Sequence, residues 1–114
     1  MIAVIFELQP CEGLADRYFA LAAELRETLV QQPGFLSVER FESLTQPGRF
    51  LSLSFWTDEA AVRGWRQQMA HRDAQREGRA SVFADYRLRV AEVLRDYGLH
   101  ERHQAPADAR DALG

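Results

Sequence analysis

The sequence lacks or nearly lacks several residue types, and each absence narrows the fold class or the function. Of its 114 residues 14 are basic and 17 acidic, and every basic residue is Arg because Lys is absent. The net charge of −3 provides no basic excess that would favour nucleic acid or an anionic membrane surface as a partner. Cys11 is the only cysteine, so a scaffold built on internal disulfides is excluded.

Long apolar runs are also missing. No run approaches the roughly 20 residues that a transmembrane helix needs, and Ile2 to Phe6 is typical of those present. The N-terminus has neither the basic segment nor the extended apolar core of a signal peptide. We therefore expect a cytoplasmic protein, and its 46% hydrophobic and 27% charged residues are typical of a globular domain.

Two kinds of periodicity alternate along the chain. Residues 2–8 are apolar, rich in β-branched side chains and followed by turn residues, which predicts a strand. From Leu14 to Leu29 apolar residues recur every three or four positions, as on one face of an amphipathic helix. The same criteria predict strands over 35–43 and 49–56 joined by a Pro-Gly turn, a helix from an N-cap at Thr57 through Arg76, and a last regular segment over 82–97.

The resulting order, β-α-β-β-α-β, predicts an α+β fold of the ferredoxin-like type, with both helices on one face of an antiparallel sheet. We assign residues 1–98 to this domain and residues 99–114 to a polar, mobile C-terminal tail. A sheet face that meets water should be polar at alternate positions. The first strand is instead apolar on both faces. In the strand over 49–56, Phe50 and Trp56 likewise lie on the face opposite Leu51, Leu53 and Phe55. We therefore predict a homodimer in which the second sheet faces pack together.

Few residues of the predicted domain are suited to catalysis, and no Gly-rich phosphate loop or metal-ligand cluster is present. Trp65 lies on the apolar side of the second helix, either as a core anchor or as a pocket wall for a planar ligand. His71 is the only histidine of the domain and is either a surface or core residue or an acid–base group. It lies about 120° around an unbroken helix from Trp65, so the two converge only if the helix bends near residues 68–70. Gln75 shares the face of His71.

Arg87 and Arg89 point to the same side of the last strand. One interpretation is cross-strand ion pairing with an acidic residue such as Glu7, Glu39 or Glu42. The other is a grip on an anionic or carbonyl oxygen of a ligand beneath the helices. His100 and His103 in the tail have a helical metal-ligand spacing, but in a segment of this composition we expect solvated residues and no metal.

Several short motifs occur in order along residues 1–98. They are Pro33-Gly34-Phe35, Phe55-Trp56 leading into Asp58-Glu59-Ala60, Trp65, the stretch 71–79 and the strand 85–93. In order and spacing they resemble the antibiotic biosynthesis monooxygenase (ABM) family. The resemblance implies a ferredoxin-like subunit that forms a dimeric α/β barrel, with a ligand pocket between the sheet and the helices of each subunit.

The same resemblance implies two kinds of chemistry. The family includes cofactor-free oxygenases that act on quinols and aromatic polyketides, and haem-degrading monooxygenases. The haem-degrading branch has an Asn on the first strand, and a Trp and a His in the second helical region. Trp65 matches the Trp, Gln75 stands at the spacing of the His, and His71 lies one turn earlier. Phe6 and Glu7 stand where the Asn would be, and the chain contains no Asn.

Three functions follow from these residues and the resemblance. The first is a monooxygenase that oxidises a small electron-rich aromatic or quinol with molecular oxygen and no bound cofactor. We select His71 as its base, Trp65 as an aromatic wall and Arg87 or Arg89 as the oxyanion partner. Gln75 and Phe6 are selected as further substrate contacts. The second is a haem-binding or haem-degrading protein with His71 as axial ligand. The third is a ligand-binding stress-response dimer without catalysis.

Overall fold

The protein, in a computed structural model, is described over residues 1–75 and 80–110; the side chains of residues 71–75, 80 and 110 lie outside that description. The predicted α+β class and element order are confirmed. None of the described helices has both the length and the apolar character needed to cross a membrane. The elements are β1 (Ile2–Pro10), α1 (Ala15–Leu29), β2 (Phe35–Glu42), β3 (Phe50–Trp56), α2 (Glu59–Gln75), the 3-10 turn η1 (Ala80–Val82), β4 (Phe83–Glu92) and α3 (Ala107–Arg110).

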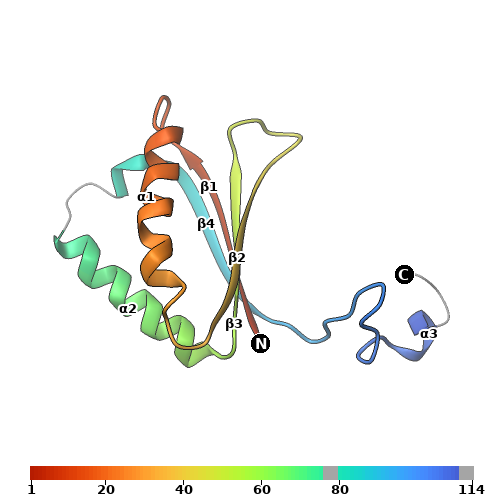
Figure 1. The fold of residues 1–114 in the computed structure, drawn as a ribbon. Helices are drawn as coiled ribbons and strands as arrows, with labels where there is room; N and C mark the ends of the chain where they lie inside the picture. The colour runs from red at the N-terminus through yellow and green to blue at the C-terminus, as the bar shows by residue number, and fades with distance from the viewer. Residues whose placement is uncertain (76–79, 111–114) are drawn as a thin grey trace.

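The four strands form one antiparallel sheet in the order β2-β3-β1-β4, and α1 and α2 cover the same face of it (Figure 1). Directly paired residues of antiparallel strands point to the same side of a sheet. One cross-strand row that faces the helices therefore contains Arg40, Ser52, Phe6 and Leu88, taken from β2 to β4. We call this side the helix face and the other the open face.

The core beneath the helices is divided into two clusters. At one end of the sheet the buried residues are Leu8, Tyr18 and Val82. At the other end they are Leu29, Trp56 and Val62. Each cluster joins the sheet to α1, and the second also includes the first turns of α2.

Gly34 brings the start of β2 against the start of α2. Its φ of +83° lies in the left-handed region that glycine adopts without strain. A Cβ here would lie 2.5 Å from the Cβ of Ala61 and 2.6 Å from Oγ1 of Thr57, so a larger residue would push the helix away. The Pro-Gly-Phe motif thus sets the close packing of α2 on the sheet.

Several element boundaries differ from the sequence predictions, and two of them, the start of α2 and the end of the last strand, are the most informative. The N-cap of α2 is Asp58 rather than Thr57, because Oδ1 of Asp58 accepts the backbone N–H of Ala61 at 2.8 Å. The last strand ends at Glu92 rather than near residue 97. Its partner β1 begins at Ile2, and the final backbone hydrogen bond, from Val93 N–H to the Met1 carbonyl, is 2.9 Å long.

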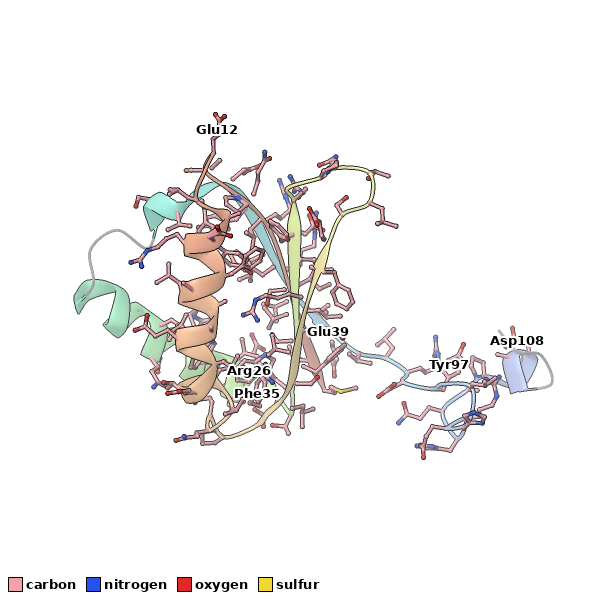
Figure 2. All side chains as sticks on the ribbon, turned by 45° about the horizontal axis from the view of Figure 1, so that its top comes forward. Glu12, Arg26, Phe35, Glu39, Tyr97 and Asp108 are labelled. Carbon is pink, nitrogen blue, oxygen red and sulfur yellow. The ribbon has the colours of Figure 1, made fainter. Side chains whose placement is uncertain are left out.

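After Val93 the chain leaves the sheet, and Tyr97 and Asp108 lie away from both long helices (Figures 1 and 2). The segment makes contacts of its own. The Asp96 backbone N–H donates to Oε1 of Gln104 at 2.8 Å, and the Arg102 guanidinium lies 5.6 Å from the centre of the Tyr97 ring. This extension accounts for a radius of gyration of 16.5 Å, larger than the roughly 13 Å of a compact chain of this length.

Candidate functional site

A cavity of about 340 Å³ lies between the helix face of the sheet and the two long helices. Most of its lining side chains are apolar. The strands form its floor, with β1 and β3 at the centre. Helix α1 contributes one wall and α2 the other, through residues that include Leu21, Leu25, Leu29, Val62, Trp65 and Met69.

Two tryptophans form the end of the cavity next to the start of α2. Their ring centres are 6.4 Å apart and the rings are inclined by 35°. Trp56 is 1% exposed, and its indole N–H donates to Oγ of Ser54 at 2.9 Å, which fixes the ring in the core. Trp65 is half-buried and lines the cavity while packing against the same core cluster. Trp65 is therefore in a position to act both as an anchor and as a wall.

Phe6 lines the cavity from the middle of β1. It makes edge-to-face contacts with Phe83 and Tyr86, with ring centres 5.5 and 5.7 Å away. Of the four site residues selected from the sequence whose side chains the structure describes, Trp65 and Phe6 line this cavity.

The cavity also contains polar groups that sequence reasoning missed. Arg40, half-buried on β2, donates from Nε to the hydroxyl oxygen of Tyr18 at 3.3 Å. Ser52 lies beside Arg40 in the same cross-strand row. The signal that could have identified Arg40 is its spacing of two from Val38, an apolar residue that also faces the helices.

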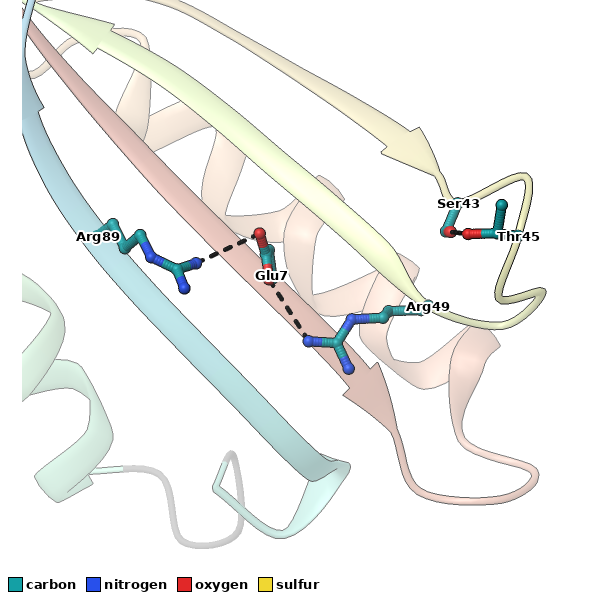
Figure 3. Close-up of polar contacts among 5 residues, drawn as sticks. All are labelled: Glu7, Ser43, Thr45, Arg49 and Arg89. Carbon is teal, nitrogen blue, oxygen red and sulfur yellow. Dashed lines mark hydrogen bonds and ion pairs between the residues drawn. The ribbon is translucent and has the colours of Figure 1, made fainter.

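Arg87 and Arg89 do not belong to this cavity. They pair with Glu7 and Ile5 across β1, on the open face. The Glu7 carboxylate accepts hydrogen bonds from Arg89 and from Arg49, each at 3.4 Å (Figure 3). The cross-strand ion pair is thus confirmed for Arg89, whereas a grip by this pair on a ligand beneath the helices does not fit their position.

His71 and Gln75 lie in the last turns of α2, and their side chains are outside the described residues. The helix is continuous from Glu59 to Gln75, without the break near residues 68–70 that would let Trp65 and His71 converge. The roles of His71 and Gln75 therefore stay predictions.

The other candidate reactive groups lie outside the cavity. Cys11 donates from Sγ to the Ser81 carbonyl at 3.3 Å. In the tail, Nδ1 of the exposed His103 is 3.6 Å from a carboxylate oxygen of Glu101. Within residues 1–75 and 80–110, no group of three or more His, Cys, Asp or Glu side chains is placed to hold a metal ion.

The element order, the sheet and the cavity under two helices define a class of small α+β proteins with an internal, mainly apolar cavity between the sheet and the helices. The model of the antibiotic biosynthesis monooxygenase family matches residues 1–77, which run from β1 through α2 and include Trp65. The chain belongs to this family, as the motifs in its sequence indicated.

Two curated proteins are similar to the chain over most of its length. The jasmonate monooxygenase ABM of Pyricularia oryzae is 41% identical over 112 residues, which are 97% of this chain and 52% of that protein. The uncharacterised protein YqjZ of Bacillus subtilis is 36% identical over 81 residues, which are 71% of this chain and 63% of that protein. The chain thus spans between about half and two thirds of these relatives.

Solved structures confirm the fold. The haem-degrader MhuD of Mycobacterium tuberculosis, with two haems bound in its active site, is similar with a TM-score of 0.70 and 18% identity, over 86% of this chain and all of that chain. An antibiotic biosynthesis monooxygenase gives a TM-score of 0.60 and 21% identity, over 82% of this chain and 99% of the other. At these identities the likeness concerns the fold alone.

Proposed function

We propose that the protein is a monooxygenase that oxidises a small electron-rich aromatic or quinol with molecular oxygen, without a bound cofactor. The observation that carries the proposal is the cavity of about 340 Å³ walled by Trp65 and Phe6, in a member of the antibiotic biosynthesis monooxygenase family. Apolar and aromatic walls suit a planar organic molecule, and binding such a molecule displaces water from the cavity.

The chemistry needs a base and a substrate that supplies its own electrons. For an anthrone, a base removes a proton from the methylene carbon, and the resulting anion reacts with oxygen. One oxygen atom becomes the new carbonyl and the other leaves as water, while the two C–H bonds of the substrate supply all four electrons. His71 is the proposed base and Gln75 a proposed substrate contact, both on α2 beyond Trp65.

Haem binding is the second candidate, suggested by the fold shared with MhuD. Among the described residues that line the cavity, none supplies the imidazole or thiolate that haem iron commonly takes. His71 is the proposed ligand, so a titration with hemin on wild type and His71→Ala separates this candidate from the first. A Soret band that saturates in wild type and is lost in the variant would favour haem.

We also propose that the open face packs against a second copy of the chain. Apolar side chains cover its centre, from Ile5 on β1 and Leu51, Leu53 and Phe55 on β3. Within residues 1–75 and 80–110, neither long helix covers this face (Figure 1). Sheet-to-sheet packing would bury this apolar area.

The proposed activity is tested by oxygen uptake with a panel of quinols, anthrone and jasmonate, the compound in the name of the curated relative. Leu25→Trp fills the cavity from α1, and Leu44→Trp, at a position 98% exposed in the β2–β3 turn, is the matched control. We expect Leu25→Trp and His71→Ala to lose at least about tenfold in rate and Leu44→Trp to keep it. Equal rates in wild type and Leu25→Trp, in folded protein by circular dichroism, would place the reaction outside the cavity.

A further inference from the structure

Arg40 places a positive charge in a cavity that is otherwise mainly apolar. It is half-buried on β2 and points to the helix face, in the row that also contains Ser52 and Phe6. A guanidinium withdrawn from water is costly unless an anion or several acceptors surround it. Among the described residues, no carboxylate lies within 4.0 Å of the Arg40 nitrogens, and its hydrogen-bond partner there is the Tyr18 hydroxyl.

Two arginines of the open face differ from Arg40 because each has a carboxylate partner. Arg49 and Arg89 share the carboxylate of Glu7, which lies between them (Figure 3). Each of these guanidiniums thus has a carboxylate partner within the protein, with one negative charge shared between two positive ones. The charge of Arg40, on the other side of the same sheet, has no such partner in the described part of the chain.

The hydrogen bond to Tyr18 also orients the Arg40 guanidinium. With Nε engaged, the two terminal nitrogens are left with donors, and a guanidinium can present such donors side by side to a carboxylate. Tyr18, 5% exposed, accepts from Arg40 and so keeps its own hydroxyl hydrogen to donate. Ser52 adds a second hydroxyl on the floor beside them.

We infer that the cavity binds a carboxylic acid with an apolar body, whose carboxylate is held by Arg40 with Tyr18 and whose body lies toward Trp65. This inference rests on the proposed function only in taking the ligand to be the substrate of the same cavity. Arg40 is then a specificity-determining residue, and neutral molecules of the same shape bind more weakly.

The test is calorimetric titration, without oxygen, of 1-naphthaleneacetate and 1-naphthaleneacetamide, which match in shape and differ in charge. We expect wild type to bind the acid about ten- to a hundredfold more tightly than the amide, as for charge-assisted hydrogen bonds. Arg40→Gln should lose this preference with little change for the amide, and Tyr18→Phe should lose part of it. Arg26→Gln, an exposed position of α1 outside the cavity lining, should change neither affinity.

Equal affinities of wild type for the acid and the amide, or binding of neither, would overturn the inference. So would a preference that survives in Arg40→Gln and disappears in Arg66→Gln, the other arginine of the cavity lining, which is exposed on α2. If Arg40→Gln does not fold, the affinities of wild type and of Arg40→Lys for the acid and the amide still test the inference. Because binding is measured without oxygen, a failure of the proposed oxygenation leaves this result unaffected, and the reverse also holds.

Discussion

The two faces of the sheet are built from the same four strands but are suited to different tasks. The helix face has a cavity of about 340 Å³ with aromatic walls and, at the half-buried Arg40, a charge that no described carboxylate neutralises. The open face has apolar residues at its centre and a carboxylate shared by two arginines. Arg40 and Arg89 are both strand residues, and their orientation relative to the helices decides whether each can meet a ligand or an ion-pair partner. Residue type alone therefore does not assign a role in this fold.

The largest effect is expected for the tryptophan pair on the helix face. Trp56→Ala should lower the free energy of unfolding by about 3–5 kcal/mol, because a fully buried ring is lost and Ser54 loses its donor. Trp65→Ala should cost less because Trp65 is half-buried, while weakening ligand binding. Urea unfolding of both variants checks the difference. Equal losses would contradict the division between a core ring and a cavity wall.

On the open face the expected effect is on assembly. Leu53→Glu places a charge at the centre of the proposed sheet-to-sheet contact and should weaken the dimer by about 2 kcal/mol or more. Leu44→Glu, in the exposed turn, is the control and should leave the dimer intact. Sedimentation velocity at micromolar concentration measures both. A wild-type chain that sediments as a monomer would refute the proposed use of this face.

Two glycines differ in their surroundings: Gly34 contacts α2, and Gly48 lies in the exposed β2–β3 turn. Gly34→Ala should cost about 1–3 kcal/mol, because a positive φ is combined with contacts below 3.0 Å to α2. Gly48→Ala has a similar φ of +88° and nothing within 4 Å of its added Cβ, so only the backbone strain of about 1 kcal/mol remains. Thermal unfolding measures both. A larger loss in Gly48→Ala would show that the contact with α2 is unimportant.

The smallest effect is expected at the ion pairs of the open face. In the monomeric chain, Glu7→Gln should change the unfolding free energy by less than about 1 kcal/mol, since Glu7, Arg49 and Arg89 are each partly exposed there and solvent screens them. Chemical unfolding at low and high salt checks this, because the small contribution should fall further with added salt. A loss of several kcal/mol would mean that Glu7 is a buried structural group, as in a tightly closed dimer interface.

The sequence predicted the element order, the two long helices and the position of Trp65 on the apolar side of the second helix because these depend on local periodicity, whereas Phe6 was selected through the family resemblance. It did not predict Arg40 as a cavity residue because the register of β2 shifts between Phe35 and Ser37. Simple alternation from Phe35 would turn Arg40 to the open face. The irregularity lets Phe35, Val38 and Arg40 all face the helices, and it depends on pairing with β3 rather than on local residue preference. The ion pairs of Glu7 likewise depend on which strands become neighbours in the sheet, and local sequence does not determine this.

The most direct test of the central claim, that the helix-covered cavity is where a substrate meets oxygen, is isotope labelling with ¹⁸O₂ and anthrone, corrected for the reaction without protein. We predict one labelled oxygen per anthraquinone formed by wild type and by Leu44→Trp, and no product above background from Leu25→Trp. Product without label, or equal labelled product from the filled cavity of Leu25→Trp, would contradict it.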